Sequence, residues 1–336
     1  MKDIARELGI SVATVSRALK DSPSISKERR ELIQRYAREH DFTPNVLAMG
    51  LRHTNVQPQK IIGVIIPQFA HYYFSTILSG IETEASQRGY RIIAAQSNEL
   101  YEREVALCQS FLEHRVCGVI VSQARDTHRY EHFEKLRSNG IPLVFYDRIS
   151  TGINAPRVVV DDYAGAKNAV SHLISTGCRR IAFYGTKSNM EIVKNRYNGY
   201  CDALREAGIS VDEALVQNCG CRSEAEDVTP SMFADDAVAP DAFFCINDST
   251  AIGVLHAVKR MGKRVPEDVS ICGFANDNYS LACDPLLTTV EQRGTEVGRN
   301  AVDILISLVE GTVPSDKVEK RIVRTNLIVR GTTRGS

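Results

Sequence analysis

A short stretch near the start of the chain carries side chains suited to reading base pairs. They are small apolar groups, hydroxyls and one guanidinium, at Val12, Ala13, Thr14, Ser16 and Arg17. Small apolar groups can contact thymine methyls, hydroxyls can reach phosphates, and an arginine fork can bond guanine O6 and N7. We therefore predict that these residues form one outer helix face, which enters the major groove of DNA.

Two helices joined by a tight turn would position this face. Ile4 and Leu8 lie four residues apart and give the first helix one apolar side. Gly9 stands where the chain reverses and positive φ is often required. Ser11 is a favourable N-cap for a second helix over Val12–Leu19. The pattern predicts a helix-turn-helix.

A third helix and a connection would complete this head, predicted to span residues 1–59. Ser26 precedes the third helix, whose inward face would comprise Leu32, Ile33, Tyr36 and Ala37. Pro44 suits the first turn of a short helix over 44–52, with Leu51 on its apolar side. Such a short helix is marginal alone, so it is either a plain linker helix or folds when paired with its copy on DNA.

Aromatic, amide, carboxylate and arginine side chains follow the predicted strands of the remaining chain, 60–336. Ligands of open α/β sheets bind beyond the carboxyl ends of the strands. The candidates are Phe69, Tyr73, Phe74, Gln96, Asp147, Arg196, Asn247, Asn276 and Asp277. This mixture suits a neutral polyhydroxy ligand, because rings stack on C–H surfaces while polar groups bond hydroxyls. Each candidate could equally be a loop cap or turn residue. The pair Asp161–Asp162 is the weakest, because it could simply cap a helix.

Short β-branched runs alternate with helix-period segments after residue 60. The predicted strands are 61–66, 90–95, 116–121, 143–146, 157–160, 180–184, 242–246 and 269–273. The predicted helices lie near 73–88, 101–114, 163–176, 194–207, 248–261 and 294–310. Continuous apolar strands indicate parallel sheets covered on both faces, here in two doubly wound α/β lobes. We expect an N-lobe over 60–160 and 290–318 and a C-lobe over 161–289 and 319–336, with a run at 321–329 closing one of them.

Composition narrows the class of protein. The 336 residues are 43% hydrophobic and 24% charged, an ordinary globular mixture. Residues 1–60 carry 11 basic and 7 acidic side chains and the rest carry 30 and 34. From charge alone, this asymmetry indicates either an anionic partner for the head or a chance fluctuation over sixty residues. The sequence contains no run of 18 apolar residues, so we expect no membrane span. The charged start of the chain lacks the apolar core of a signal peptide. Nine scattered cysteines indicate free thiols in a reducing cytoplasm.

Sequence motifs for catalysis are absent. The sequence contains no Gly-x-Ser-x-Gly, His-Glu-x-x-His, P-loop or Gly-x-Gly-x-x-Gly pattern, and its cysteines lack metal-ligand spacing. We therefore predict a protein that is not an enzyme and needs no cofactor or metal. An enzyme on a doubly wound fold and a transport-type solute-binding protein are the alternatives, and the basic head argues against the latter.

The chain resembles the LacI/GalR (lactose-repressor) family of bacterial transcriptional regulators along nearly its whole length. The similarity lies in the run Asp3-Ile4-Ala5, the run Gly9 to Arg17, Ile62-Gly-Val-Ile-Ile-Pro67, Val265-Pro-Glu-Asp-Val-Ser-Ile-Cys-Gly-Phe274 and Leu287-Thr-Thr-Val290. Pro44-Asn45 followed by Leu51 resembles the family's hinge. Three positions differ from the family pattern: Met1 stands near the usual capping Ser or Thr, Met49-Gly50 replaces a common polar residue, and Ala275 replaces a common acid.

This resemblance implies a homodimer that binds a pseudo-palindromic operator in double-stranded DNA. Arg17 would read bases, Asn45 would lie in the hinge, and Leu51 would wedge into the minor groove. A periplasmic-binding-protein-like core would sense a small effector, with Asp147, Arg196 and Asn247 among the family's effector positions. The missing cap leads us to expect a few further residues before Met1 in the natural protein.

Together these features predict a cytoplasmic, nucleoid-associated transcriptional regulator. We expect a repressor of carbohydrate-utilisation genes whose operator affinity is controlled by a sugar-like effector between the lobes. A purine or a phosphorylated metabolite is the alternative effector, because Tyr73 and Phe74 could stack a base and Arg148 or Arg196 could meet a phosphate.

Overall fold

The computed structural model describes residues 2–19, 21–40, 60–150, 152–187, 190–235, 237–314 and 318–335. The chain divides into two compact units, Met1–Gln57 and Pro58–Ser336, called here the head and the core. The predicted hinge helix over 44–52, with Asn45 and Leu51, lies outside the described residues. None of the described helices is long and apolar enough to cross a membrane.

The described part of the head consists of α1 (Lys2–Glu7), α2 (Val12–Ala18) and α3 (Lys27–Glu39). Its buried side chains are Ile4, Ala5, Val15, Ala18, Ile33 and Ala37. Gly9 has φ +61° in the turn after α1, and Ser11 Oγ accepts a hydrogen bond from Thr14 N at 3.1 Å. Both local predictions for the helix-turn-helix are therefore confirmed.

One predicted core residue of the head is wrong. Leu32 is 44% exposed, whereas Ile33 is fully buried and Ala37 nearly so. Ile33 and Ala37 lie four apart and define the buried side of α3, which leaves Leu32 one position away on the rim. Periodicity alone predicts the apolar stripe but not its exact edge.

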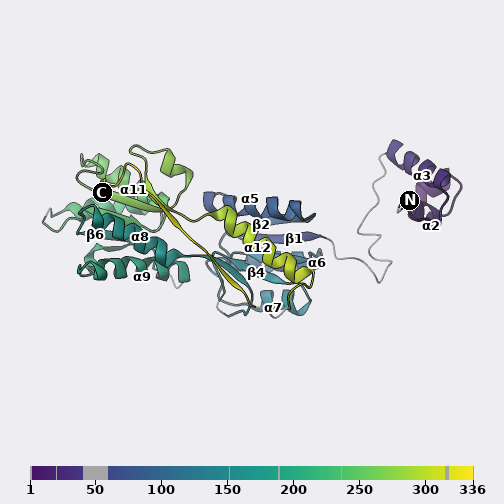
Figure 1. Cartoon of the computed structure of the whole chain (residues 1–336), viewed down its shortest axis with the longest axis horizontal. Coiled ribbons are helices and arrows are strands. Elements are labelled where there is room, and N and C mark those ends of the chain that lie inside the picture. Colours follow the sequence, from purple (N-terminus) through teal and green to yellow (C-terminus); the bar gives the residue numbers. More distant parts are fainter. Residues whose placement is uncertain are drawn as a thin grey trace. The chain divides into compact units, whose positions relative to one another are not determined.

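The core contains two six-stranded sheets, one in each lobe (Figure 1). The N-lobe sheet has the order β11-β5-β4-β3-β1-β2 and is parallel throughout. Its strands are β1 (Ile61–Ile66), β2 (Arg91–Gln96), β3 (Gly118–Val121), β4 (Leu143–Tyr146), β5 (Arg157–Val160) and β11 (Lys320–Val323). The C-lobe sheet has the order β12-β10-β9-β8-β6-β7, and only the β12–β10 pair is antiparallel. Its strands are β6 (Ile181–Gly185), β7 (Val216–Asn218), β8 (Ala242–Cys245), β9 (Ser270–Ala275), β10 (Thr288–Glu291) and β12 (Asn326–Ile328).

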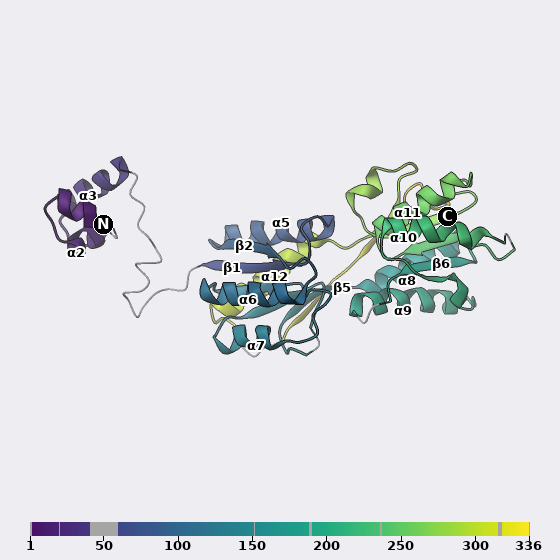
Figure 2. The ribbon, with the colours of Figure 1, turned by 180° about the vertical axis from the view of Figure 1, so that it is seen from behind.

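Helices cover both faces of each sheet. In the N-lobe they are α5 (Tyr72–Gln87) and α12 (Gly294–Val309) on one face, and α6 (Tyr101–Glu113) and α7 (Glu131–Ser138) on the other (Figures 1 and 2). In the C-lobe they are α8 (Asp162–Ser175) and α9 (Glu191–Glu206), opposite α10 (Arg222–Val228) and α11 (Asp248–Arg260). Successive strand residues enter opposite apolar layers, as Phe244 and Phe243 do. This two-sided burial is why the strands are continuously apolar.

The chain crosses between the lobes after β5, after β10 and between β11 and β12. The predicted single run over 321–329 is wrong, because its two halves pair in different sheets. Lys320–Val323 pairs with β5 in the N-lobe, and Asn326–Ile328 pairs with β10 in the C-lobe. The predicted lobe limits at 318/319 and 289/290 are therefore displaced, since β10 also remains in the C-lobe to Glu291. The polar pair Arg324-Thr325 separates the halves, but the sequence does not show which sheet edge each half joins.

Several short elements were not predicted. They are α7, β7, α10 and β10, none longer than eight residues. A helix of two turns or a strand of three residues holds too few apolar positions for a period to be recognised. The longer predicted helices and strands are all present, with ends shifted by up to three residues.

Glycines allow α5 and α12 to cross closely. A Cβ added at Gly298 of α12 would meet the Ile77 carbonyl oxygen and lie 2.8 Å from Ile81 N. Both obstacles are backbone atoms of α5, so neither can rotate away. The crossing therefore fixes the residue type at this position.

Gly298→Ala should destabilise the core by about 1–2 kcal/mol. Overpacking costs about 1–3 kcal/mol, which outweighs the gain of up to about 1 kcal/mol in helix propensity. The measurement is the urea midpoint of the full chain, with Arg299→Ala on the exposed side of α12 as control, expected within about 0.5 kcal/mol of the parent. A stabilised Gly298→Ala variant would contradict the close crossing.

Candidate functional site

The outer face of α2 is available to a partner of the head. Ala13 and Arg17 are exposed, whereas Val12, Thr14 and Ser16 are half-buried. The hydroxyls of Ser11 and Thr14 lie 2.9 Å apart at the first turn of the helix. A face with one exposed guanidinium among small side chains has the shape and donors that major-groove contact needs.

Hydrogen bonds from α3 fix the end of α2. Gln34 Nε2 donates to the carbonyl of Ala18 at 3.0 Å and to Asp21 Oδ1 at 2.9 Å. Arg30 Nη1 donates to the Asp21 carbonyl at 3.3 Å. These contacts hold the turn after α2 against α3, so the predicted base-reading helix has a fixed orientation within the head.

In the core, Arg196, the strongest of the predicted effector residues, is already bonded within the protein. Its Nε donates to Asp162 Oδ1 at 2.8 Å, and its Nη1 donates to the Ile246 carbonyl at 2.6 Å. Its guanidinium carbon lies 3.7 Å from the centre of the Phe274 ring. Asp162, ranked weakest among the candidates from the sequence, is thus the ionic partner of Arg196. Asp161 caps α8, because its Oδ1 accepts a hydrogen bond from Ala164 N at 3.0 Å.

Asp147 is a buried carboxyl at the end of β4. It is 6% exposed and has φ +55°. Burial raises its pKa to about 6, with Asp162 adding to the rise and Arg148 opposing it. A carboxylate in this position gains from any ligand that donates hydrogen bonds to it.

The predicted C-lobe residues are mostly engaged within the protein. Asn247 caps α11, accepting from Thr250 N at 2.8 Å and donating to the Gly220 carbonyl at 3.0 Å. Asn276 Oδ1 accepts from Arg330 Nη2 at 2.7 Å. Asp277 Oδ1 accepts from Tyr279 N at 3.1 Å. For these three, the loop-cap and turn roles are present in the structure, and contact with an effector remains a prediction.

The predicted N-lobe aromatics differ in accessibility. Phe69 is 40% exposed, and its backbone N–H donates to Gln96 Oε1 at 3.1 Å. Phe74 is buried beside Tyr146, their ring centres 6.4 Å apart. The Tyr73 hydroxyl is buried without a hydrogen-bond partner, and burial, then Asp147 and Asp162, raises its pKa well above its usual range. The hydroxyl therefore keeps its proton and can donate to a ligand.

Buried polar atoms without a partner gather at the carboxyl edge of the N-lobe sheet. Within the described part of the chain nine such side-chain atoms exist, and six belong to this edge. They are Tyr73 OH, Ser97 Oγ, Glu99 Oε1, Ser122 Oγ, Gln123 Oε1 and Arg148 Nε. Of these residues only Tyr73 was among the predicted effector residues, and Arg148 was named only as a contact for a phosphorylated effector. The signal was present, since each follows a predicted strand, but residue type alone did not separate them from ordinary loop residues.

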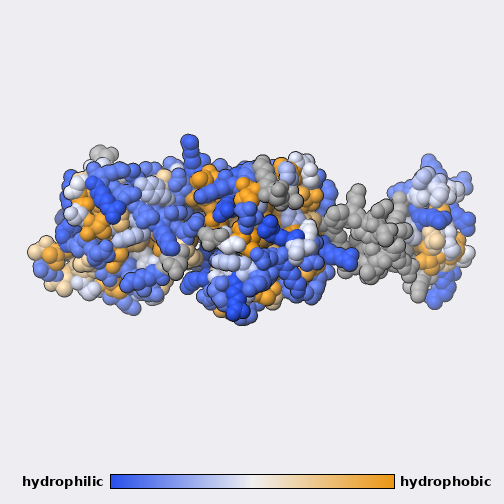
Figure 3. Space-filling model, turned by 90° about the horizontal axis from the view of Figure 1, so that it is seen from below, coloured by the Kyte–Doolittle hydropathy of each residue, from blue (hydrophilic) through white to orange (hydrophobic). Residues whose placement is uncertain are grey.

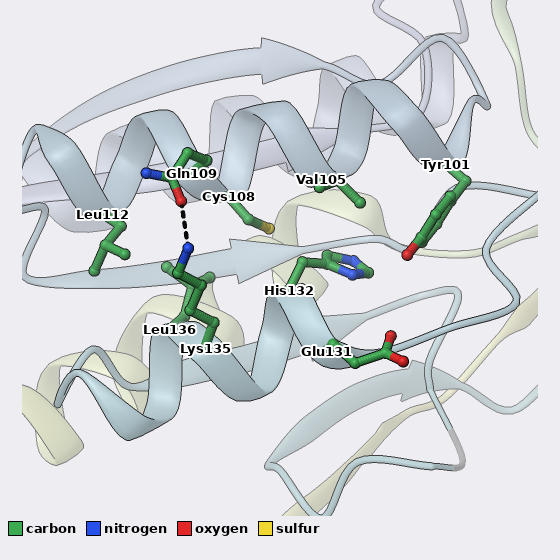
Figure 4. A pocket seen from close by; sticks show the side chains of 9 residues that line it. All are labelled: Tyr101, Val105, Cys108, Gln109, Leu112, Glu131, His132, Lys135 and Leu136. Carbon is green, nitrogen blue, oxygen red and sulfur yellow. Dashed lines mark hydrogen bonds between the residues drawn. The ribbon is translucent and has the colours of Figure 1, made fainter.

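A cavity of about 110 Å³ opens where the lobes adjoin. Its walls include Asp147, Val160 and Ile322 from the N-lobe and Asp162 and Asn195 from the C-lobe. A larger cavity of about 220 Å³ lies elsewhere, between α6 and α7 (Figure 4). There Gln109 and Lys135 bridge the two helices with a hydrogen bond of 2.9 Å, and none of the predicted effector residues lines it.

Comparisons with known proteins agree with both parts of the chain. Residues 1–45 match the family model for bacterial regulatory proteins of the lacI family, and residues 170–333 match a periplasmic binding protein-like domain. The HTH-type transcriptional repressor CytR of Escherichia coli (strain K12) is 30% identical over 99% of this chain and 96% of its own length. The ribose operon repressor of Bacillus subtilis (strain 168) is 30% identical over 92% of this chain and 91% of its own. The structure of a CelR–cellobiose complex, a transcriptional regulator, superposes with a TM-score of 0.73 at 25% identity, covering 98% of both chains.

The two family matches and the full-length similarity to a transcriptional repressor define a DNA-binding transcriptional regulator with a periplasmic-binding-protein-like core, not an enzyme. The chain belongs to the LacI family of bacterial transcriptional repressors. The predicted α/β fold class and family are thereby confirmed.

Arg17→Ala should weaken binding to a specific operator by about 1–3 kcal/mol and relax base preference at one position in each half-site. Arg17 is exposed, so its removal should leave the folded head intact. Fluorescence anisotropy on operator and mutated operator measures both effects. Arg137→Ala, the same change on an exposed position of α7, is the control. An equal loss for both variants, or an unchanged operator affinity for Arg17→Ala, would refute base reading by Arg17.

Asp147→Asn should raise the free energy of unfolding of the core relative to the parent, by an amount that grows as pH rises. The pKa of Asp147 is about 6 when folded against an ordinary 3.8, so the folded state binds the proton more tightly. Its favourable contribution is present at low pH and lost as pH rises through 6. Between pH 4.5 and 7 the difference in unfolding free energy should grow by roughly 2 kcal/mol.

Urea unfolding at several pH values measures this difference. Asp268→Asn is the control, because hydrogen bonds from Arg264 hold the pKa of Asp268 at about 2 and its charge is constant over this range. A difference for Asp147→Asn that is flat with pH would contradict the buried, uncompensated carboxylate.

Proposed function

We propose that the protein represses carbohydrate-utilisation genes and that a sugar-like effector, bound between the lobes, controls its operator affinity. The observation that carries this proposal is the set of unpartnered polar atoms at the N-lobe edge beside Asp147. Burial of such atoms without partners costs free energy, which a hydroxyl-rich ligand would recover. The cellobiose complex of CelR and the ribose operon repressor support a sugar effector.

The proposed effector residues come from both walls of the cleft. They are Phe69, Tyr73, Phe74, Gln96, Asp147, Arg196, Asn247, Asn276 and Asp277. Three chain crossings join the lobes, so a ligand that bridges both walls would favour a closed arrangement. Such a ligand alters operator affinity only through its different affinities for the two arrangements.

For DNA, we propose a homodimer on a pseudo-palindromic operator. Val12, Ala13, Thr14, Ser16 and Arg17 would meet the major groove, with Asn45 and Leu51 acting in the hinge. Dimerisation is supported by large apolar side chains exposed on the core, which include Ile93, Tyr279, Leu281 and Leu286. Figure 3 shows apolar patches among hydrophilic residues on one face of the core. Since operator DNA lies in the nucleoid, we propose a cytoplasmic, nucleoid-associated protein.

The test is effector-dependent release of the full chain from its operator. An operator is first selected from a random DNA library, and binding is then measured with neutral sugars, sugar phosphates, nucleosides and nucleobases. We expect a neutral sugar to raise the melting temperature and to change operator affinity at least tenfold. If no compound changes both, effector control at this cleft is refuted.

Matched variants connect the response to the cleft. Tyr73→Phe removes only a hydroxyl that has no protein partner, so it should weaken the sugar response about tenfold while operator binding without sugar is retained. Arg17→Ala should do the reverse, with weakened operator binding and an unchanged melting shift from sugar. A Tyr73→Phe variant with a full sugar response would place the effector elsewhere.

A further inference from the structure

An ion pair between Glu99 and Arg148 connects three loops at the carboxyl edge of the N-lobe sheet. Glu99 follows β2, and its Oε2 accepts from Arg148 Nη1, which follows β4. The same oxygen accepts from Arg125 N at 3.0 Å, in the loop after β3. Gln123 N also donates to the Arg148 carbonyl at 3.1 Å. The pair therefore fixes the relative positions of all three loops.

Both side chains are largely buried, yet each keeps one bonding group free. The Glu99 side chain is 10% exposed and that of Arg148 is 13% exposed. The Arg148 guanidinium carbon lies 5.6 Å from the centre of the Phe74 ring, which places the arginine at the predicted cleft. Glu99 Oε1 has no hydrogen bond and lies 3.8 Å from Nη2 of the exposed Arg125. Arg148 Nε is likewise unpartnered.

The unpartnered groups at this edge are complementary to a ligand that can both donate and accept hydrogen bonds. Glu99 Oε1 and Gln123 Oε1 can only accept, whereas Arg148 Nε can only donate. The hydroxyls of Tyr73, Ser97 and Ser122 can do either. A ligand hydroxyl also does either, so two neighbouring hydroxyls can serve the carboxylate and the guanidinium together. A phosphate dianion offers acceptors alone and leaves both Glu99 and Gln123 unserved.

Charge at the edge acts in the same direction. Arg148 is neutralised by Glu99, and Arg196 is neutralised by Asp162. Asp147, buried near these pairs, interacts electrostatically with all four groups, and the further cation at this edge, Arg125, is an exposed side chain 3.8 Å from Glu99. A dianion placed here would meet the buried carboxylate of Asp147, while the one arginine beyond the two buried pairs, Arg125, is exposed to water, so little of the dianion's desolvation cost would be recovered.

We infer that Glu99 and Arg148 are specificity-determining residues that select an unphosphorylated ring with neighbouring free hydroxyls. This inference rests on the proposed effector cleft and goes beyond it by naming the residues that read the ligand and the class that they reject. Free sugars and the ribose of a nucleoside share this chemistry. Sugar phosphates keep ring hydroxyls but add a dianion, and nucleobases without a sugar lack the hydroxylated ring.

The first experiment uses matched ligands on the full chain bound to its selected operator. Each neutral sugar and nucleoside is compared with its own phosphate ester and, for nucleosides, with the free base. We expect release by one or more unphosphorylated polyols and at least 30-fold weaker binding of the matching phosphate by calorimetry. Response to the nucleoside but to no free sugar identifies ribose as the source of the hydroxyls, and the opposite pattern identifies a free sugar.

The second experiment tests the pair. Glu99→Gln keeps the size of the side chain and removes the charge, so the polyol should bind at least tenfold more weakly and the penalty for its phosphate should shrink. Gln123→Leu removes one acceptor without disturbing the ion pair, and should weaken the polyol severalfold. Arg125→Gln changes the exposed neighbour of the same carboxylate and should leave polyol affinity within twofold. Melting temperatures without ligand establish that each variant folds.

The outcomes distinguish failure of the specificity inference from failure of the proposed function. Release by a phosphorylated compound or a bare nucleobase, with polyols inactive, overturns the inference and leaves the ligand-controlled repressor in place. Unchanged polyol affinity and phosphate discrimination in folded Glu99→Gln and Gln123→Leu also overturn it. Failure of every compound to alter operator binding overturns the proposed function itself.

Discussion

The contact on which the cleft depends is the buried ion pair of Arg196 and Asp162. Asp162 is the first residue of α8, directly after the chain leaves the N-lobe, and Arg196 connects it to the end of β8 and to the Phe274 ring of β9. Water cannot solvate either charged group in place of its partner, since both side chains are at most 8% exposed. Breaking such a pair from one side costs about 3–5 kcal/mol, because the other charge stays buried. The pair therefore fixes where the C-lobe begins relative to the crossing strand.

This arrangement divides the tasks between the two walls of the cleft. Most predicted residues of the C-lobe wall already have hydrogen-bond partners, as Asn247, Asn276 and Asp277 bond groups of their own lobe. The N-lobe wall retains unserved donors and acceptors on loops that are tied together through Glu99. A ligand would gain most of its polar contacts from the N-lobe and would use the C-lobe as a preformed surface. We therefore expect selectivity among ligands to depend on the N-lobe loops, and closure of the lobes around the ligand to depend on its contact with the C-lobe.

Much of the fold follows from local patterns in the sequence. Ser11 and Gly9 predict the helix-turn-helix because capping and positive φ are properties of single residues. The β1 and β8 strands are recognisable because burial on both faces makes every residue apolar. The fate of Lys320–Val323 and Asn326–Ile328 was not predictable, since pairing with β5 or β10 depends on positions set by residues far away in the chain.

The candidate site shows the same limit. Asp147 could be proposed because it follows a strand, and Arg196 because it lies in a helix beside the predicted cleft. The sequence does not show, however, that Arg196 is already paired with Asp162. Nor does it show that Glu99, a residue with φ +64° in a tight loop, faces Arg148. Whether a polar side chain is satisfied depends on three-dimensional neighbours, and unsatisfied groups are what a ligand completes. In this protein most of the residues with unpartnered polar atoms are ones that strand-end position predicts only weakly, Tyr73 being the exception, while Arg196 and Asn247, predicted from the sequence, are bonded within the protein.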